Sequence, residues 1–173
     1  EYALCGTPTY DLMKRSPFID DCESALQDVI NACSGISAIV GTLTQTEKGI
    51  ISAAAVIQDG RLIKYIGKRN VFKAREVSRI KPSEGCEIVT INGNQVAVVV
   101  GEDLLVEREF GIKTRLILSI YADEFKWDQR FQRYDYFKNL AYEQNKTTIL
   151  VNYLGGQTDY IFDGSSCAYN KNK

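Results

Sequence analysis

Apolar residues at helical spacing mark two segments of the chain. In residues 17–33, apolar side chains recur every three or four positions, and Gly35 follows directly. Proline suits the first turn of a helix and glycine suits its end, so the segment beginning at Pro17 is predicted to be a helix. Residues 127–145 predict a second, longer helix. Its expected inner face consists of Phe131, Tyr134, Phe137, Leu140 and Ala141.

Short apolar runs separated by turn residues predict strands. Asp59-Gly60 separates two such runs, and Asn92-Gly93-Asn94 separates another two. Such pairs between apolar runs are strong hairpin signals. Residues 96–100 are apolar throughout, as in a central strand covered on both faces. The predicted strands are 36–43, 50–57, 61–66, 86–91, 95–100, 116–120, 148–153 and 160–162.

Hairpins mixed with two substantial helices predict an α+β domain in which helices cover a mixed sheet. The 173 residues are 45% apolar and 25% charged, which is the usual mix of a globular protein. No repeat, low-complexity tract or linker interrupts the chain, so residues 1–173 are predicted to form a single domain.

Charge and residue usage exclude several classes of function. The net charge is −1 and no basic patch is present, so neither nucleic acid nor a membrane surface is expected as a partner. No apolar run is long enough to span a bilayer. The five cysteines are scattered without a C-x-x-C pair, which favours reduced thiols in a cytoplasmic protein and predicts no metal site.

The chain contains no histidine. Its absence excludes Ser-His-Asp and Cys-His catalysis as well as histidine-bound metals. Any acid–base chemistry must therefore use Glu, Asp, Lys, Tyr or Cys side chains.

A long motif near the end of the sequence carries a family resemblance. Residues 151–166 read V-N-Y-L-G-G-Q-T-D-Y-I-F-D-G-S-S. This stretch is similar to V-N-x-x-G-G-Q-D-E-x-x-F-D-G-x-S of the glutaminase domains of glutamine-dependent NAD synthetases, which are members of the nitrilase (carbon–nitrogen hydrolase) superfamily.

Three further segments resemble the same family in the same order. The stretch E-Y-A-L-C-G from Glu1, followed by Asp11-Leu12, resembles E-L-x-L-x-G-Y-x-x-x-D-L. Residues 54–57 with the Asp59-Gly60 turn resemble the strand pair that leads to the family lysine, here Lys68. Residues 96–104, V-A-V-V-V-G-E-D-L, resemble V-x-V-x-x-C-E-D-x.

The resemblance implies a four-layer α-β-β-α sandwich, which in the family is often formed by pairing subunits, so a homo-oligomer is expected. The chain begins at Glu1 rather than Met and is expected to be a partial domain that lacks the first strand and helix and the C-terminal part. A synthetase domain is a possible continuation beyond Lys173. No cofactor is expected in this domain.

The resemblance also implies roles for three positions. Glu1 falls at the general base and Lys68 at the lysine that stabilises the oxyanion, whereas Gly101 replaces the nucleophilic cysteine. Two alternatives remain open from the residues alone. Glu1 could be a solvated carboxylate at a frayed terminus, and Lys68 could be an exposed charge at the end of a strand.

Other positions also depart from the family. Thr7 stands where a tyrosine is expected, and Tyr121 lies where the family has small residues; with Glu102, these are the candidate substrate-binding residues. The loop after Lys68 is shorter than in the family, and Lys73-Ala74 replaces Asp-Glu.

These departures leave three functions open. The favoured one is a catalytically degenerate nitrilase-like domain that keeps the fold for assembly or for binding glutamine or another small amide. The alternatives are an active glutaminase with an unusual nucleophile site and a small α+β binding or scaffolding module.

Overall fold

A computed structural model of the chain describes residues 1–72, 79–106, 110–111 and 113–171. The helices are η1 (Tyr10–Lys14), α1 (Ser16–Ala32), α3 (Asp103–Val106) and α4 (Gln129–Gln144). The strands are β1 (Ser37–Thr46), β2 (Gly49–Gln58), β3 (Arg61–Gly67), β4 (Glu87–Ile91), β5 (Asn94–Val100), β6 (Leu116–Tyr121), β7 (Thr147–Asn152), β8 (Leu154–Gln157), β9 (Tyr160–Asp163) and β10 (Cys167–Tyr169).

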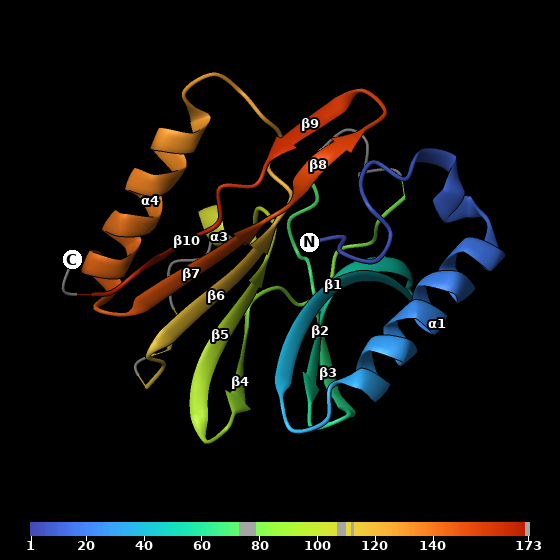
Figure 1. Ribbon diagram of the computed structural model, residues 1–173, viewed down its shortest axis with the longest axis horizontal. Helices are drawn as coiled ribbons and strands as arrows, with labels where there is room; N and C mark the ends of the chain where they lie inside the picture. Colours follow the sequence, from blue (N-terminus) through green and yellow to red (C-terminus); the bar gives the residue numbers. More distant parts are fainter. Residues whose placement is uncertain (73–78, 107–109, 112, 172–173) are drawn as a thin grey trace.

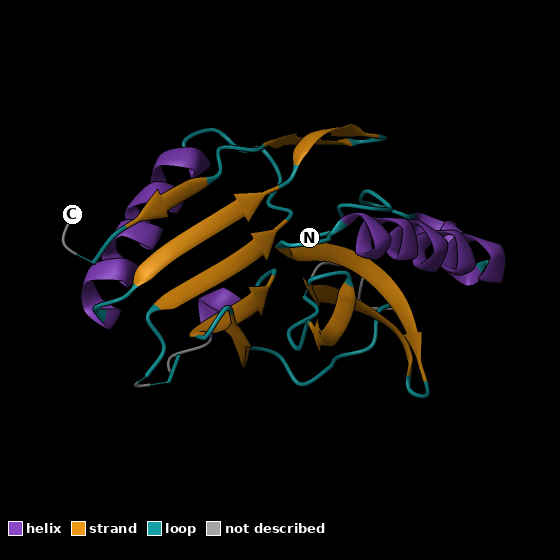
Figure 2. Cartoon of the chain, turned by 60° about the horizontal axis from the view of Figure 1, so that its bottom comes forward, coloured by secondary structure: helices purple, strands orange, loops and turns teal. Residues whose placement is uncertain are grey.

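The larger elements form four layers, as Figure 1 and Figure 2 show. Helix α1 packs on a three-stranded sheet, that sheet packs on a five-stranded sheet, and α4 covers the outer face of the second sheet. The α-β-β-α sandwich implied by the resemblance is therefore confirmed. No helix within the described ranges is long and apolar enough to cross a membrane.

The three-stranded sheet is antiparallel, in the order β1-β2-β3. Its second turn has positive φ at both Asp59 (48°) and Gly60 (70°), as expected of the tight hairpin that the sequence predicts. Strand β2 alternates between two cores: Ala55 and Ile57 face α1, whereas Ala54 faces the second sheet. This period-two pattern places the sheet between two apolar layers.

The five-stranded sheet has the order β10-β7-β6-β5-β4. Its central strands β5, β6 and β7 are parallel, and β4 and β10 pair antiparallel at the edges. Strand β5 is buried on both faces, as predicted: Val96 and Val98 face the first sheet, and Ala97 and Val99 face α4. The carboxyl end of this buried strand leads directly into the candidate site.

The predicted inner face of the second helix is wrong at Phe131, and Tyr134 is only half-buried. Phe131 is 58% exposed, whereas Arg133 is only 6% exposed. Arg133 points inward because its guanidinium forms ion pairs with Asp123 and Asp163, which apolar periodicity cannot reveal. Phe137, Leu140 and Ala141 are buried, as predicted.

The sequence patterns also missed two short strands. Strand β8 pairs with β9 in a separate hairpin, and β10 adds three residues to the edge of β7. In Figure 1 the β8–β9 hairpin lies in the upper part, whereas β10 lies between β7 and α4.

Candidate functional site

The site lies where the backbone turns sharply after the buried strand β5. Gly101 has φ +57°, a left-handed conformation that glycine adopts without the steric cost of a side chain. Its N–H donates a 2.8 Å hydrogen bond to the carbonyl oxygen of Ile120 at the end of the neighbouring strand β6. Helix α3 begins at Asp103, two residues later. The turn therefore fixes residue 101 at the carboxyl end of the central strands.

A side chain at position 101 would point into a cluster of charged groups. An ideal Cβ built on Gly101 lies 2.9 Å from Nζ of Lys68 and 3.0 Å from Oε1 of Glu1. A nucleophile there would thus stand beside both a carboxylate and an ammonium group. This is the relative placement that the family motif implies for the three positions.

Glu1 is buried, with 5% of its surface exposed, and its carboxylate is held from three sides. Oε1 accepts hydrogen bonds from Nζ of Lys68 (3.0 Å) and from the hydroxyl of Ser52 (3.4 Å). Oε2 accepts from the backbone N–H of Ala122 at 3.2 Å. Glu1 is therefore not a solvated terminal carboxylate.

Lys68 directly follows β3 and is fully buried. Its backbone N–H donates to Ser52 and its carbonyl accepts from Ser83, each at 2.8 Å, so the main chain is held on both sides. Its Nζ also lies 2.5 Å from Oε2 of Glu102. One ammonium thus bridges two carboxylates, and the solvated alternative for Lys68 is wrong. Mutual attraction offsets the cost of removing these charges from water.

Asp103 fastens the turn at Gly101 to the segment that follows Lys68, a role that the sequence patterns did not suggest. Its Oδ2 accepts from the backbone N–H of Arg69 at 2.8 Å. Its Oδ1 accepts from the backbone and side-chain N–H groups of Asn70, at 2.6 and 2.8 Å. The only sequence signal is its place in the E-D pair of the turn. Lys73-Ala74, further along the same loop, lie outside the described residues.

A cluster of ion pairs next to α4 holds the loop after β6, whose backbone contacts Glu1. Arg133 donates 2.7 Å hydrogen bonds to Asp123 and to Asp163. The N–H of Asp123 donates to the side-chain oxygen of Asn152 at 2.9 Å, which ties the loop after β6 to the end of β7. Because Ala122 precedes Asp123, this cluster positions the backbone N–H that contacts Glu1.

Of the candidate substrate-binding residues, Glu102 and Tyr121 lie at the charged cluster. Burial raises the pKa of the Tyr121 phenol, and the carboxylates of Glu102, Asp123 and Glu1 raise it further, so the ring stays neutral. Thr7 is buried at 2% exposure. Within the described ranges, however, no hydrogen bond joins Thr7 to Glu1, Lys68 or Glu102.

Cys5, the cysteine closest in sequence to Glu1, is not an activated thiol. Its hydrogen bond with Cys22 and its burial raise the pKa of the Cys5 thiol well above the ordinary value. A thiol must ionise to act as a nucleophile, so Cys5 is poorly suited to replace the missing one. The described part of the chain also contains no group of three or more His, Cys, Asp or Glu side chains arranged to hold a metal ion.

In sequence and in fold, the chain resembles known proteins over nearly its whole length. No family model matches. The glutamine-dependent NAD(+) synthetase of Xanthomonas campestris is 30% identical over 175 residues, which cover 96% of this chain and 32% of that protein. The structure of the same kind of enzyme from Acinetobacter baumannii superposes with a TM-score of 0.83 at 23% identity, covering 96% of this chain and 33% of the other.

A nitrilase-superfamily amidase has the same fold. A variant of the Nesterenkonia amidase that carries the acetamide moiety of fluoroacetamide on its active-site cysteine superposes with a TM-score of 0.79 at 16% identity. The alignment covers 98% of this chain and 68% of the amidase. The chain therefore has the fold of these solved structures. In sequence it is similar to the glutaminase domain of glutamine-dependent NAD synthetases, and it spans about a third of the length of these relatives.

Proposed function

We propose that this domain binds a small primary amide, with glutamine as the leading candidate, but does not hydrolyse it. The carrying observation is Gly101, which lies beside Lys68 and Glu1 and offers no side-chain atom to attack a carbonyl. The neighbouring carboxylate and ammonium are retained and buried. The domain thus keeps groups that recognise an amide and lacks the group that cleaves it.

Covalent amide hydrolysis requires a nucleophile at this point. A thiolate adds to the carbonyl carbon, a carboxylate takes the thiol proton and passes it to the leaving amine, and an ammonium stabilises the oxyanion. In the Nesterenkonia amidase a cysteine forms the bond to the acetamide moiety. With glycine at position 101, no bond to the substrate forms and ammonia is not released.

The lysine lies close to the position that a side chain on residue 101 would take. Its Nζ lies 2.9 Å from the position of a Cβ on residue 101, which is closer than real Cβ atoms approach their neighbours. A cysteine at 101 would therefore require Lys68 to move while it is bound to Glu1 and Glu102.

The remaining groups are complementary to a primary amide. An amide offers N–H donors and a carbonyl acceptor. Glu1 accepts hydrogen bonds and Lys68 donates them, and their functional groups lie 3.0 Å apart. The backbone turn at Gly101 places no side chain beside this pair. This pairing favours an amide over a purely apolar ligand.

Glutamine labelled with ¹⁵N at its side-chain amide tests both halves of the proposal in one NMR experiment. We expect saturable shifts of the backbone amide signals of Gly101 and Ala122, and no ¹⁵N-ammonium after long incubation. Norvaline, which has the amino-acid backbone without the amide, is the matched ligand and should shift neither signal. Ammonium formed over many turnovers, or shifts that are equal for both ligands, would overturn the proposal.

An active glutaminase is the second candidate, and the intact Glu1–Lys68 pair favours it. On that hypothesis, another nucleophile or a water molecule replaces the thiol. From the relatives' name we further propose that the domain works beside a synthetase region, in a cytoplasmic homo-oligomer. The same labelled glutamine separates the two candidates, because only the active enzyme forms ammonium.

A further inference from the structure

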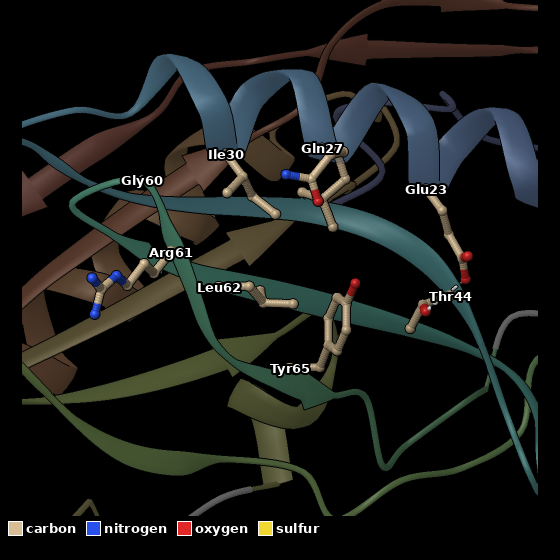
Figure 3. A pocket seen from close by; sticks show the side chains of 9 residues that line it. Glu23, Gln27, Ile30, Thr44, Gly60, Arg61, Leu62 and Tyr65 are labelled. Carbon is tan, nitrogen blue, oxygen red and sulfur yellow. Dashed lines mark hydrogen bonds between the residues drawn. The ribbon is translucent and has the colours of Figure 1, made fainter.

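A groove of about 560 Å³ lies between α1 and the three-stranded sheet, on the side of that sheet away from the charged site (Figure 3). Its walls come from α1, from β3 and from Thr44 at the end of β1. Helix α1 packs mainly over β1 and β2, so Leu62 remains 37% exposed on the neighbouring strand. The volume lies in the range of ligand sites, and the groove is independent of the amide site.

The two ends of the groove carry opposite charges. Figure 3 shows the Arg61 guanidinium at one end and the Glu23 carboxylate at the other. Glu23 accepts a 3.3 Å hydrogen bond from Thr44. Among the described residues, no side chain forms an ion pair or hydrogen bond with the guanidinium of Arg61. An occupant can therefore pair with this cation without displacing an existing partner.

Helix geometry gives the separation of the two ends. The N–H of Gly60 donates to the carbonyl of Cys33 at 2.8 Å, which places Arg61 beside the last turn of α1. Glu23 comes ten residues before Cys33 on the same helix. A rise of 1.5 Å per residue makes the groove roughly 15 Å long.

The groove also has an apolar part, and Tyr65 is one of the polar residues on its walls. Leu26 is buried at 2% exposure and forms the floor with Leu62. Burial raises the pKa of the Tyr65 phenol, which therefore stays neutral and can donate or accept a hydrogen bond. An occupant thus needs an apolar centre flanked by charged ends.

We infer that this groove binds a short extended peptide segment of a partner protein, with an acidic side chain at Arg61 and a basic side chain at Glu23. An extended chain advances about 3.3 Å per residue, so two residues four positions apart are separated by roughly 13 Å. They lie on the same face of the strand as the residue midway between them, which would contact Leu26 and Leu62.

The test uses the mixed-charge peptide acetyl-Glu-Ser-Leu-Ser-Lys-amide and two analogues of it. The Lys-Lys analogue has Lys at both ends, and the Glu-Glu analogue has Glu at both ends. Binding is followed by ¹H–¹⁵N NMR titration of the whole chain. We expect shifts centred on Leu62 and Tyr65 for the mixed-charge peptide, and at least tenfold weaker binding of both analogues.

Charge reversal within the groove makes the test specific. Arg61→Glu should lower the affinity for the mixed-charge peptide at least tenfold and make the Lys-Lys analogue the tightest-binding ligand. Glu23→Lys should instead favour the Glu-Glu analogue. Lys138→Glu, an exposed substitution on α4 with the same change in charge as Arg61→Glu, is the matched control for that variant and should leave all three affinities unchanged.

Two results would overturn the inference. One is the absence of shifts at Leu62 and Tyr65 at millimolar peptide. The other is binding whose preference for end charges does not reverse in Arg61→Glu. Both variants alter exposed side chains, and an unchanged circular dichroism spectrum verifies that they are folded.

Discussion

The Nζ atom of Lys68 lies 3.0 Å from Oε1 of Glu1, although 67 positions separate the two residues. The same ammonium lies 2.5 Å from Glu102, and all three side chains are nearly or fully buried. Two carboxylates and one ammonium have therefore been removed from water together, and each depends on the others for stability. The empty position at Gly101 lies directly beside this group.

Lys68→Met should strongly destabilise the fold. The substitution keeps a side chain of similar length but removes the cation between Glu1 and Glu102. Leaving buried charge uncompensated costs about 3–5 kcal/mol of unfolding free energy. Urea denaturation followed by circular dichroism measures this loss.

Lys64→Met is the matched control for Lys68→Met. Lys64 pairs with Glu87 on the surface, and its side chain is 48% exposed. An exposed ion pair contributes only about 0–1 kcal/mol, so the loss should be small. Equal losses for the two variants would show that the buried cluster does not stabilise the fold.

Gly101→Ala should also cost stability, for two reasons that can be separated. Positive φ at residue 101 costs about 1–2 kcal/mol for a residue with a Cβ. Contact of the new methyl group with Lys68 adds to this cost. Gly93→Ala is the control, because φ is +77° there and nothing lies within 4 Å of the added Cβ.

The difference between these two glycine variants in urea denaturation measures the contact at the site. We expect Gly101→Ala to be the more destabilising. If Gly101→Ala loses no more unfolding free energy than Gly93→Ala, then the Lys68 side chain moves aside at little cost. The space beside Gly101 is then available for a side chain.

The raised pKa of Tyr121 should make the fold less stable at alkaline pH. Burial, with the nearby carboxylates, raises its pKa in the folded state above the ordinary value of about 10. The unfolded chain therefore loses this proton first as the pH rises. The contribution of the neutral Tyr121 phenol to the unfolding free energy is fully present below pH 10. Above pH 10 it is lost, by at most about 1.4 kcal/mol per pH unit.

Tyr121→Phe should reduce the slope of unfolding free energy against pH above pH 10. Tyr142→Phe, at a site that is 78% exposed, should keep the wild-type slope. Urea denaturation between pH 8 and pH 11 provides the comparison. Identical slopes in all three proteins would contradict the assignment of this effect to Tyr121.

Arg133→Met should destabilise the fold by about 3–5 kcal/mol, because Asp123 and Asp163 lose their buried partner. Adding Asp123→Asn and Asp163→Asn should recover part of this loss. Arg130→Met, which removes only an exposed cation stacked 5.1 Å from the ring of Phe131, should cost less than about 1 kcal/mol. No recovery in the triple variant would argue against the ion cluster.

The two main sheets and both long helices were largely predictable from local patterns. Asp59-Gly60 and the apolar run in β5 are signals within a few residues, and the structure contains the corresponding hairpin and central strand. Strands β8 and β10 were not predictable in this way. Strand β8 contains two glycines, and β10 is a three-residue edge defined by its pairing with β7.

The site was predictable only through the family motifs. Nothing local in the sequence indicates that Glu1 contacts Lys68, because their proximity results from how β3 packs beside the turn at Gly101. The burial of Arg133 was missed because apolar periodicity selects Phe131 on the same helix. Its partners Asp123 and Asp163 are 10 and 30 positions away in the sequence, respectively.

Ammonia release from glutamine by the wild-type chain and by Gly101→Cys tests the central claim most directly. We predict that both proteins release ammonia no faster than buffer, because the wild type lacks a nucleophile and the variant keeps Lys68 in the space that a cysteine needs. Sustained release over many turnovers by Gly101→Cys would show that glycine alone silences an otherwise complete site. Release by the wild type would show that the domain is an active glutaminase.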